Sequence, residues 1–149
     1  PKVVEFNCRF GDPESQVVLP LLKTPLLPYL VASAVDGGLA NTAELEFSPD
    51  AAVTTVVAAH GYPDSPRTGD EIDLTAVPDD VIVFHAGTSR TSGSLRTSGG
   101  RVFAVTGVAP TFAEAQARSR QGAEQVRFAD RVMRRDIGWR EQGRRAGVT

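Results

Sequence analysis

The stretch VEFNCRFGDPE, residues 4–14, predicts a β-strand that runs into a turn and a helix start. Because side chains alternate between the two faces of a strand, this strand would sort them by type. One face carries the apolar residues Val4, Phe6, Cys8 and Phe10. The other face carries the polar residues Glu5, Asn7 and Arg9. We expect the apolar face, with its cysteine, to be buried, and Asp12 and Pro13 to cap and begin the helix that follows.

The polar face of this strand admits two interpretations. Glu5 and Asn7 supply hard oxygen ligands of the kind that Mg²⁺ takes, and Arg9 supplies a fixed cation for a phosphate. Alternating polar and apolar residues are equally typical of any half-exposed sheet, and short motifs often match by chance. From the spacing alone, both interpretations stay open.

Composition narrows the class of protein. The chain has 149 residues, of which 41% are hydrophobic and 23% are charged, as in an ordinary globular domain. Its net charge of −2 gives no general attraction to nucleic acid or to an anionic membrane. Cys8 is the only cysteine, so no disulfide can form within the chain. No apolar run approaches the ~20 residues of a membrane span, and no signal segment is present, so we expect a cytoplasmic protein.

The first forty residues predict a helical unit that follows the opening strand. Helical spacing of apolar residues predicts helices over about 13–23 and 25–35, with Pro20 interrupting the first. The opening strand needs neighbouring strands for its backbone groups, and no earlier segment precedes it here. We therefore expect this chain to be the C-terminal portion of a longer polypeptide.

From about residue 41 the pattern changes to β-strands. Runs rich in β-branched residues predict strands at 51–59, 81–86 and 101–107, and Ser92-Gly93 suits a hairpin turn. Thr111 and Glu114 form a capping box that starts a helix, and the inward positions of this helix are mostly small. We expect an α/β (α+β) chain, with residues 1–40 ending one domain and residues 41–149 forming a small antiparallel sheet with a covering helix.

Several motifs together resemble one family. They are Glu5-Phe6-Asn7-Cys8-Arg9-Phe10-Gly11-Asp12-Pro13-Glu14, Gly61-Tyr62-Pro63, Thr68-Gly69, Val83-Phe84-His85-Ala86-Gly87-Thr88, Ser98-Gly99-Gly100-Arg101-Val102 and Arg134-Arg135-Asp136-Ile137-Gly138-Trp139. In this order they resemble the glycinamide ribonucleotide synthetases, or phosphoribosylamine–glycine ligases, over nearly the whole chain. The resemblance implies that residues 1–40 end an ATP-grasp domain and that residues 41–149 form the small C-terminal domain.

The resemblance also implies an activity and a set of site residues. The family uses ATP and Mg²⁺ (or Mn²⁺) to join glycine to 5-phosphoribosylamine through a glycyl phosphate, in de novo purine biosynthesis. By resemblance, Glu5 and Asn7 would bind the metal, and Arg9 would face the transferring phosphoryl group as a catalytic residue. Gly11, Asp12 and Pro13 would line the substrate pocket. Asp12 would hold the glycine ammonium, cap the helix, or do both.

The chain departs from the family in what it lacks. The N-terminal domain and the nucleotide-clamping lobes have no counterpart here, so we expect the isolated chain to be inactive. Its partners would be glycine, 5-phosphoribosylamine, ATP and the missing N-terminal part, with no nucleic acid and no membrane.

Two alternatives remain at this point: another ATP-grasp carboxylate–amine ligase, and a non-catalytic binding module derived from one. For the Gly99-Gly100-Arg101 turn and for His85, a purely structural role and a role near the active site both stay open.

Overall fold

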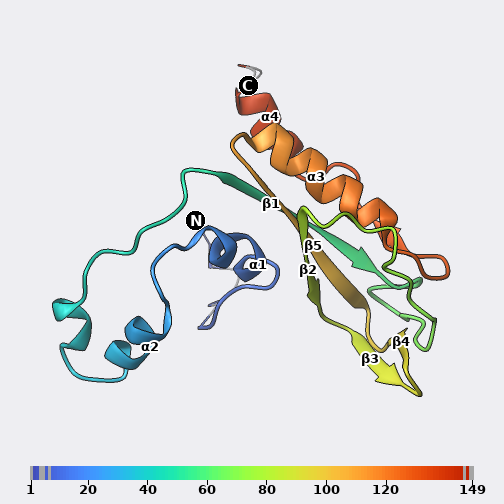
Figure 1. Cartoon of the computed structure of the whole chain (residues 1–149), viewed down its shortest axis with the longest axis horizontal. Helices are drawn as coiled ribbons and strands as arrows, with labels where there is room; N and C mark the ends of the chain where they lie inside the picture. The colour runs from blue at the N-terminus through green and yellow to red at the C-terminus, as the bar shows by residue number, and fades with distance from the viewer. Residues whose placement is uncertain (1, 4–5, 7, 146, 148–149) are drawn as a thin grey trace.

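A computed structural model describes residues 2–3, 6, 8–145 and 147 of the chain. It consists of a twisted antiparallel sheet with one long helix, and an N-terminal arm that reaches away from the sheet (Figure 1). This arrangement confirms the α/β (α+β) class expected from the sequence.

The main sheet has four antiparallel strands in the order β2-β5-β1-β6. The central strands are β1 (Ala51–Ala58) and β5 (Arg101–Ala109), which pair along their length. The outer strands are β2 (Val81–His85) and the short β6 (Val132–Met133). The three strands predicted from β-branched runs are confirmed, whereas β6 has too few residues for a sequence pattern to reveal it.

A hairpin extends beyond the sheet between β2 and β5. Its strands are β3 (Thr88–Thr91) and β4 (Ser94–Thr97), which pair only with each other as a sheet. The two residues between them, Ser92 and Gly93, have φ angles of 50° and 85°. Positive φ at both positions gives the tight turn that suits the right-handed twist of the strands, which confirms the predicted hairpin turn.

Helix α3 (Phe112–Gln125) covers one face of the central strands, and its capping box forms as predicted. Thr111 accepts a hydrogen bond from the Glu114 backbone N–H, and the Glu114 carboxylate accepts one from the Thr111 backbone. The buried positions of the helix are all small: Ala115, Ser119, Gly122 and Ala123. Small residues let the helix axis approach the sheet closely.

The close approach of α3 is visible at Gly107 of β5. A Cβ atom at this position would lie 2.4 Å from the backbone oxygen of Ala115 and 2.6 Å from the backbone nitrogen of Ser119. The Ser119 hydroxyl donates to the Val105 carbonyl at 2.8 Å and therefore accepts from the Thr55 hydroxyl at 2.7 Å. This buried chain of hydrogen bonds fixes the register of the helix against both central strands.

The hydrophobic core lies between α3 and the sheet. Its fully buried centre includes Val57, Val102, Phe103, Val105, Ala123 and Val126. A smaller cluster at the start of α3 joins Val53, Ala109 and Ala115 to the partly buried Phe112 and Ile137. The chain after α3 passes along the outer edge of β1 and ends in α4 (Trp139–Arg145), close to α3 (Figure 1).

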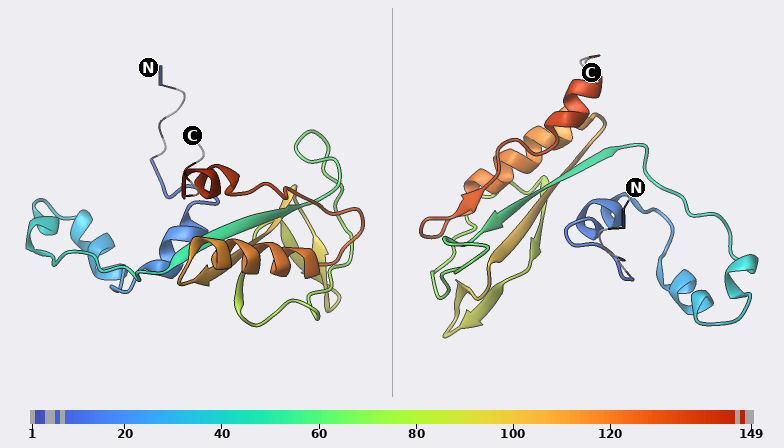
Figure 2. Two further views of the ribbon diagram at one scale, coloured as in Figure 1. Left: turned by 90° about the horizontal axis from the view of Figure 1, so that it is seen from above. Right: turned by 180° about the vertical axis from the view of Figure 1, so that it is seen from behind.

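The N-terminal arm lies on the side of the sheet opposite α3 (Figure 2). It contains α1 (Ser15–Val18), the 3₁₀ turn η1 (Leu19–Leu21), α2 (Leu27–Ser33) and the 3₁₀ turn η2 (Gly38–Asn41). Backbone hydrogen bonds from Lys23 to Glu46 (2.8 Å) and from Ser48 to Leu21 (2.7 Å) close the loop that carries α2. The two predicted helices are therefore present but shorter, because prolines sit at the starts of η1 and α2.

The predictions of a strand, of a buried apolar face and of a helix cap in the opening stretch are wrong. Its described residues form no strand, and Cys8, Phe6 and Phe10 are exposed, with 88% of Phe6 accessible to solvent. A strand needs partners for its backbone and a core for its apolar face, and the described part of the chain supplies neither there. Asp12 does not cap α1 and Pro13 does not begin it, since the helix starts at Ser15 and Glu14 occupies the cap position without a side-chain capping bond. Among the described residues, no helix is both long and apolar enough to cross a membrane.

The Gly107 contact generates a prediction about stability. Gly107→Ala should lower the free energy of unfolding by about 1–3 kcal/mol, because the new methyl group must push the α3 backbone away from β5. Urea denaturation followed by circular dichroism measures the change. Ala117→Ser, on the exposed face of the same helix, is the control and should change stability by no more than about 0.5 kcal/mol. Equal effects of the two variants would contradict the close packing.

Candidate functional site

A cavity of about 400 Å³ opens on the sheet face that α3 leaves uncovered. Its floor is formed by alternate residues of β1, and its walls come from the arm, from the loop after β1 and from the segment around β6. The lining residues are Pro13, Thr54, Val56, Ala58, Tyr62, Arg101, Val132, Met133, Arg134 and Ile137. Apolar groups therefore surround two guanidinium groups, a combination typical of small-molecule sites.

Four of the sequence motifs meet at this cavity. Pro13, Tyr62 and Arg101 come from three motifs that are far apart in the sequence, and Arg134 and Ile137 come from the fourth. The Tyr62 ring packs so close to Gly100 that a Cβ there would lie 2.3 Å from it. This contact explains why a glycine precedes Arg101. The convergence makes this cavity the candidate functional site.

Asp12 is held at the edge of the cavity by two side chains. The Arg101 guanidinium donates to a carboxylate oxygen of Asp12 at 2.8 Å and to its backbone carbonyl at 3.1 Å. The Gln16 amide donates to the other carboxylate oxygen at 2.9 Å. Asp12 and Pro13, two of the predicted substrate-pocket residues, are thus both positioned against the sheet.

A buried threonine fixes α1 beneath this turn. Thr106 of β5 is fully buried, and its hydroxyl oxygen lies 2.9 Å from the Gln16 carbonyl oxygen. The same hydroxyl lies 2.9 Å from the hydroxyl of Thr54, which lines the cavity. The helix that follows Asp12 is therefore tied to the central strands by a hydrogen bond from a buried side chain.

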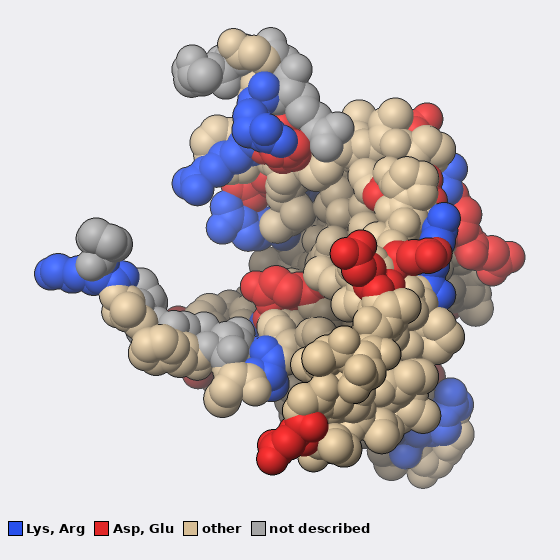
Figure 3. Space-filling view, turned by 90° about the vertical axis from the view of Figure 1, so that its left-hand side faces the viewer, with Lys and Arg blue, Asp and Glu red and all other residues tan. Residues whose placement is uncertain are grey.

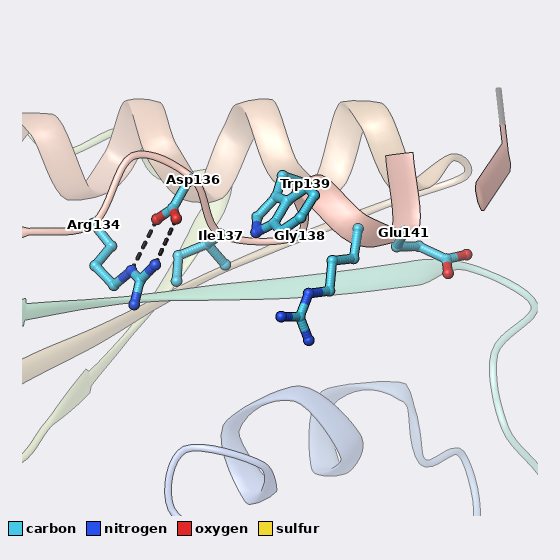
Figure 4. Close-up of a pocket in the computed structure, with 7 residues that line it drawn as sticks. Arg134, Asp136, Ile137, Gly138, Trp139 and Glu141 are labelled. Atoms are coloured by element: carbon cyan, nitrogen blue, oxygen red, sulfur yellow. Dashed lines mark hydrogen bonds and ion pairs between the residues drawn. The ribbon is translucent and has the colours of Figure 1, made fainter. Parts of the chain in front are cut away.

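Next to the cavity lies a second, more open hollow of about 490 Å³, formed by Arg134 and residues 136–141. Figure 4 shows Arg134 and Asp136 joined by two hydrogen bonds, of 2.8 and 2.5 Å. These hydrogen bonds lower the pKa of Asp136 below its ordinary 3.8 and raise the pKa of Arg134. Both groups stay charged at neutral pH, so the rim of the site keeps a fixed ion pair.

The predicted metal and phosphoryl residues are only partly described. Glu5 and Asn7 lie outside the described residues. Arg9 is exposed, and its guanidinium donates to the Phe10 carbonyl at 2.8 Å. Within the described part of the chain, no three His, Cys, Asp or Glu side chains come together as a metal site. Gly11 adjoins the Glu14 carboxylate so closely that a Cβ would lie 2.2 Å from it.

Sequence reasoning missed part of the cavity wall. Tyr62, Met133 and Ile137 were not predicted as site residues, although Tyr62 and Ile137 belong to motifs that resemble the family. The available signal was that Tyr62 and Ile137 each stand next to a glycine, Gly61 and Gly138, inside these motifs. His85 lies outside the lining; its Nδ1 is 3.0 Å from the Thr88 hydroxyl, and its ring packs edge-on against Phe103 at 5.0 Å. These contacts fit a structural histidine.

Comparison with known proteins identifies the class to which this fold and site belong. The family described as "Phosphoribosylglycinamide synthetase, C domain" matches residues 52–140, which span the sheet, α3 and the start of α4. The chain therefore belongs to this family. The matched range includes four residues that line the cavity, namely Tyr62, Arg101, Arg134 and Ile137.

Individual relatives carry a more particular name. A phosphoribosylamine–glycine ligase of Phenylobacterium zucineum is 47% identical over 97% of this chain, and one of Synechocystis is 49% identical over 92%. The crystal structure of a phosphoribosylamine–glycine ligase from Thermotoga maritima superposes with a TM-score of 0.73 and 37% identity over 92% of the chain. The chain spans only about a third of the length of these relatives (33–34%).

The Arg134–Asp136 pair generates a prediction about pH. Because the folded pKa of Asp136 is lowered, its contribution to stability is complete above pH 3.8 and is lost as the pH falls through the lowered value. Acid titration should therefore change the fluorescence of Trp139, the only tryptophan, below about pH 4. Asp136→Asn should remove this step, whereas Asp79→Asn, at an exposed site, should keep it. The same titration curve in both variants would contradict the assignment.

Proposed function

We propose that this chain is the C-terminal third of a phosphoribosylamine–glycine ligase and supplies one wall of its active site. The complete enzyme would join glycine to 5-phosphoribosylamine at the expense of ATP, through a glycyl phosphate. The observation that carries the proposal is the similarity to named ligases over more than nine-tenths of the chain. The meeting of four motifs around one cavity adds a structural observation to it.

The arm supports a second part of the proposal, namely that the chain docks onto the rest of the ligase. None of the described residues between 2 and 50 is buried. Large apolar side chains on the arm are nevertheless exposed, among them Leu27 (69%), Val31 and Val35. Figure 3, which views the molecule from the side of the arm, shows an uncharged tan area with acidic and basic groups around it. Such a surface in water favours an interface, and the remaining two-thirds of a ligase polypeptide is the partner proposed here.

The opening stretch would contribute to the nucleotide side of the completed site. Glu5 and Asn7 would hold Mg²⁺ (or Mn²⁺), whose remaining positions go to phosphate oxygens and water. A bound divalent cation stabilises the charge that develops on a transferring phosphoryl group. Arg9 has no ion-pair partner among the described residues, so its guanidinium is available to a phosphate.

The Gly11-Asp12-Pro13 turn would form the acceptor side. Asp12 carries a negative charge next to a largely apolar cavity, where it would bind the ammonium group of glycine. Pro13 forms part of the cavity wall, and Gly11 leaves room for the Glu14 carboxylate beside the turn. Binding glycine with its carboxylate toward the metal would favour attack on ATP by orientation.

The proposal predicts activity only in the assembled enzyme. The isolated chain should form no glycinamide ribonucleotide, because the nucleotide-clamping part is missing. Adding the separately expressed N-terminal two-thirds of the Phenylobacterium zucineum ligase should restore ATP-, glycine- and phosphoribosylamine-dependent release of ADP. Coupled detection of ADP measures the reaction.

A matched variant tests whether the arm forms the interface. Leu27→Asp with Val31→Asp should weaken reconstitution at least tenfold, because charges placed at an apolar interface must lose their hydration. Ile82→Asp, at an exposed position of the edge strand β2, is the control and should reconstitute normally. Turnover by the isolated chain, or equal loss in both variants, would contradict the proposal.

Substitutions in the opening stretch test the metal and phosphoryl roles in the reconstituted enzyme. Glu5→Ala and Asn7→Ala should each lower kcat by about tenfold or more at limiting Mg²⁺ and recover in part at high Mg²⁺. Arg9→Lys should lower kcat without such recovery, because lysine keeps the charge but loses the planar fork. Lys2→Gln is the control and should leave kcat unchanged. An unchanged kcat in Glu5→Ala or Asn7→Ala at limiting Mg²⁺ would count against these residues as ligands.

A further inference from the structure

Arg101 is brought to Asp12 by an irregularity in the sheet. The pairing of β1 with β5 shifts where Val57 faces Phe103 and the next residue, Ala58, faces Arg101. Val102 is therefore an extra residue, and the strand contains a β-bulge at this point. Without the bulge, Arg101 would share the face of Phe103, which lies in the core under α3. With it, the Arg101 side chain turns to the opposite face and lines the cavity.

The backbone around Arg101 is held on both sides. The Ala59 N–H donates to the Gly100 carbonyl at 2.8 Å, and the Gly87 N–H donates to the Arg101 carbonyl at 2.7 Å. Gly87 and Gly99 are in such close contact that a Cβ on Gly87 would lie 2.7 Å from the Gly99 Cα. The guanidinium therefore extends from a rigid base, although the side chain itself is 39% exposed.

The arm depends on this guanidinium for the orientation of Asp12. Arg101 binds one carboxylate oxygen and the backbone carbonyl of Asp12, and Gln16 binds the other carboxylate oxygen. Each carboxylate oxygen has two acceptor positions, so one position on each remains for a further donor. An ion pair whose members are 39% and 43% exposed stabilises a fold little, but its two-point geometry sets a direction.

We propose that Arg101 is a positioning residue that acts through Asp12, holding its carboxylate at the edge of the cavity for the ammonium group of the amino-acid substrate. The inference rests on the proposed ligase function for the identity of the substrate. The clamp itself is a property of this chain alone. Arg101 makes its contribution by orientation, and the stability of the sheet does not depend on it.

The first test uses the isolated chain. Arg101→Gln should speed hydrogen exchange at the Ser15 and Val18 amides, which donate to Gly11 and Glu14 in the turn, by about tenfold. Exchange at the central strands and the melting temperature should stay unchanged. Arg67→Gln is the matched control: Arg67 is 40% exposed and pairs with Asp70 and Asp130 at 2.9 and 3.2 Å, away from Asp12. Unchanged exchange at Ser15 and Val18 in Arg101→Gln would overturn the clamp.

The second test uses the chain reconstituted with the N-terminal part of a relative. Arg101→Gln should raise the KM for glycine roughly tenfold or more and leave the KM for ATP within twofold. Arg101→Lys should fall between Gln and the wild type, because lysine keeps the charge but cannot make both contacts to Asp12. Asp12→Asn should match Arg101→Gln, and combining the two should add no further loss.

The outcomes separate the two proposals. Equal rises in the KM for glycine and ATP, or additive losses in the double variant, would overturn a positioning role through Asp12. Absence of turnover with the wild-type chain would overturn the ligase function. In that case the exchange experiment still decides whether Arg101 holds the Asp12 turn.

Discussion

The close contact of α3 with the central strands is the constraint on which the rest of the molecule depends. Gly107 brings the helix backbone against β5, and the Thr55–Ser119 hydrogen bond sets its register inside the core. Because the helix packs on one face of the two central strands, the opposite face of the same strands is left to the arm and the cavity. The buried face of the sheet thus provides a rigid support for the face that lines the cavity.

The face of the sheet that lines the cavity depends on irregularities in the strands and loops. The bulge at Val102 turns Arg101 toward the cavity, and Gly100 makes room for the Tyr62 ring beside it. Thr106, which is fully buried, ties the first turn of the arm to the floor. Four segments of the chain therefore meet at the cavity. Glycines, an extra residue in β5 and polar contacts allow them to do so. Three of these four segments lie within residues 52–140, the range that matches the family.

Much of the sheet could be predicted because its signals are local. The β-branched runs of β1, β2 and β5, the Ser92-Gly93 turn and the Thr111–Glu114 capping box each depend on residues close in sequence. The opening stretch was predicted wrongly for the opposite reason. Its alternating pattern would suit a strand between neighbours, but in this chain Phe6, Cys8 and Phe10 are exposed. A periodic pattern shows that a segment could form a strand with one buried face. It does not show whether neighbouring strands and a core are present to pair with it.

The sequence by itself determined the strands β1, β2 and β5, the Ser92-Gly93 turn and helix α3 with its capping box, because each of these depends on neighbours within a few residues. It also carries the motifs by which its family can be recognised. Tertiary structure alone decided that Asp12 binds Arg101 across 89 residues instead of capping its own helix. The reason is geometric. The bulge changes the side of the sheet to which Arg101 points, and a register shift between two strands leaves no trace in the periodicity of either one.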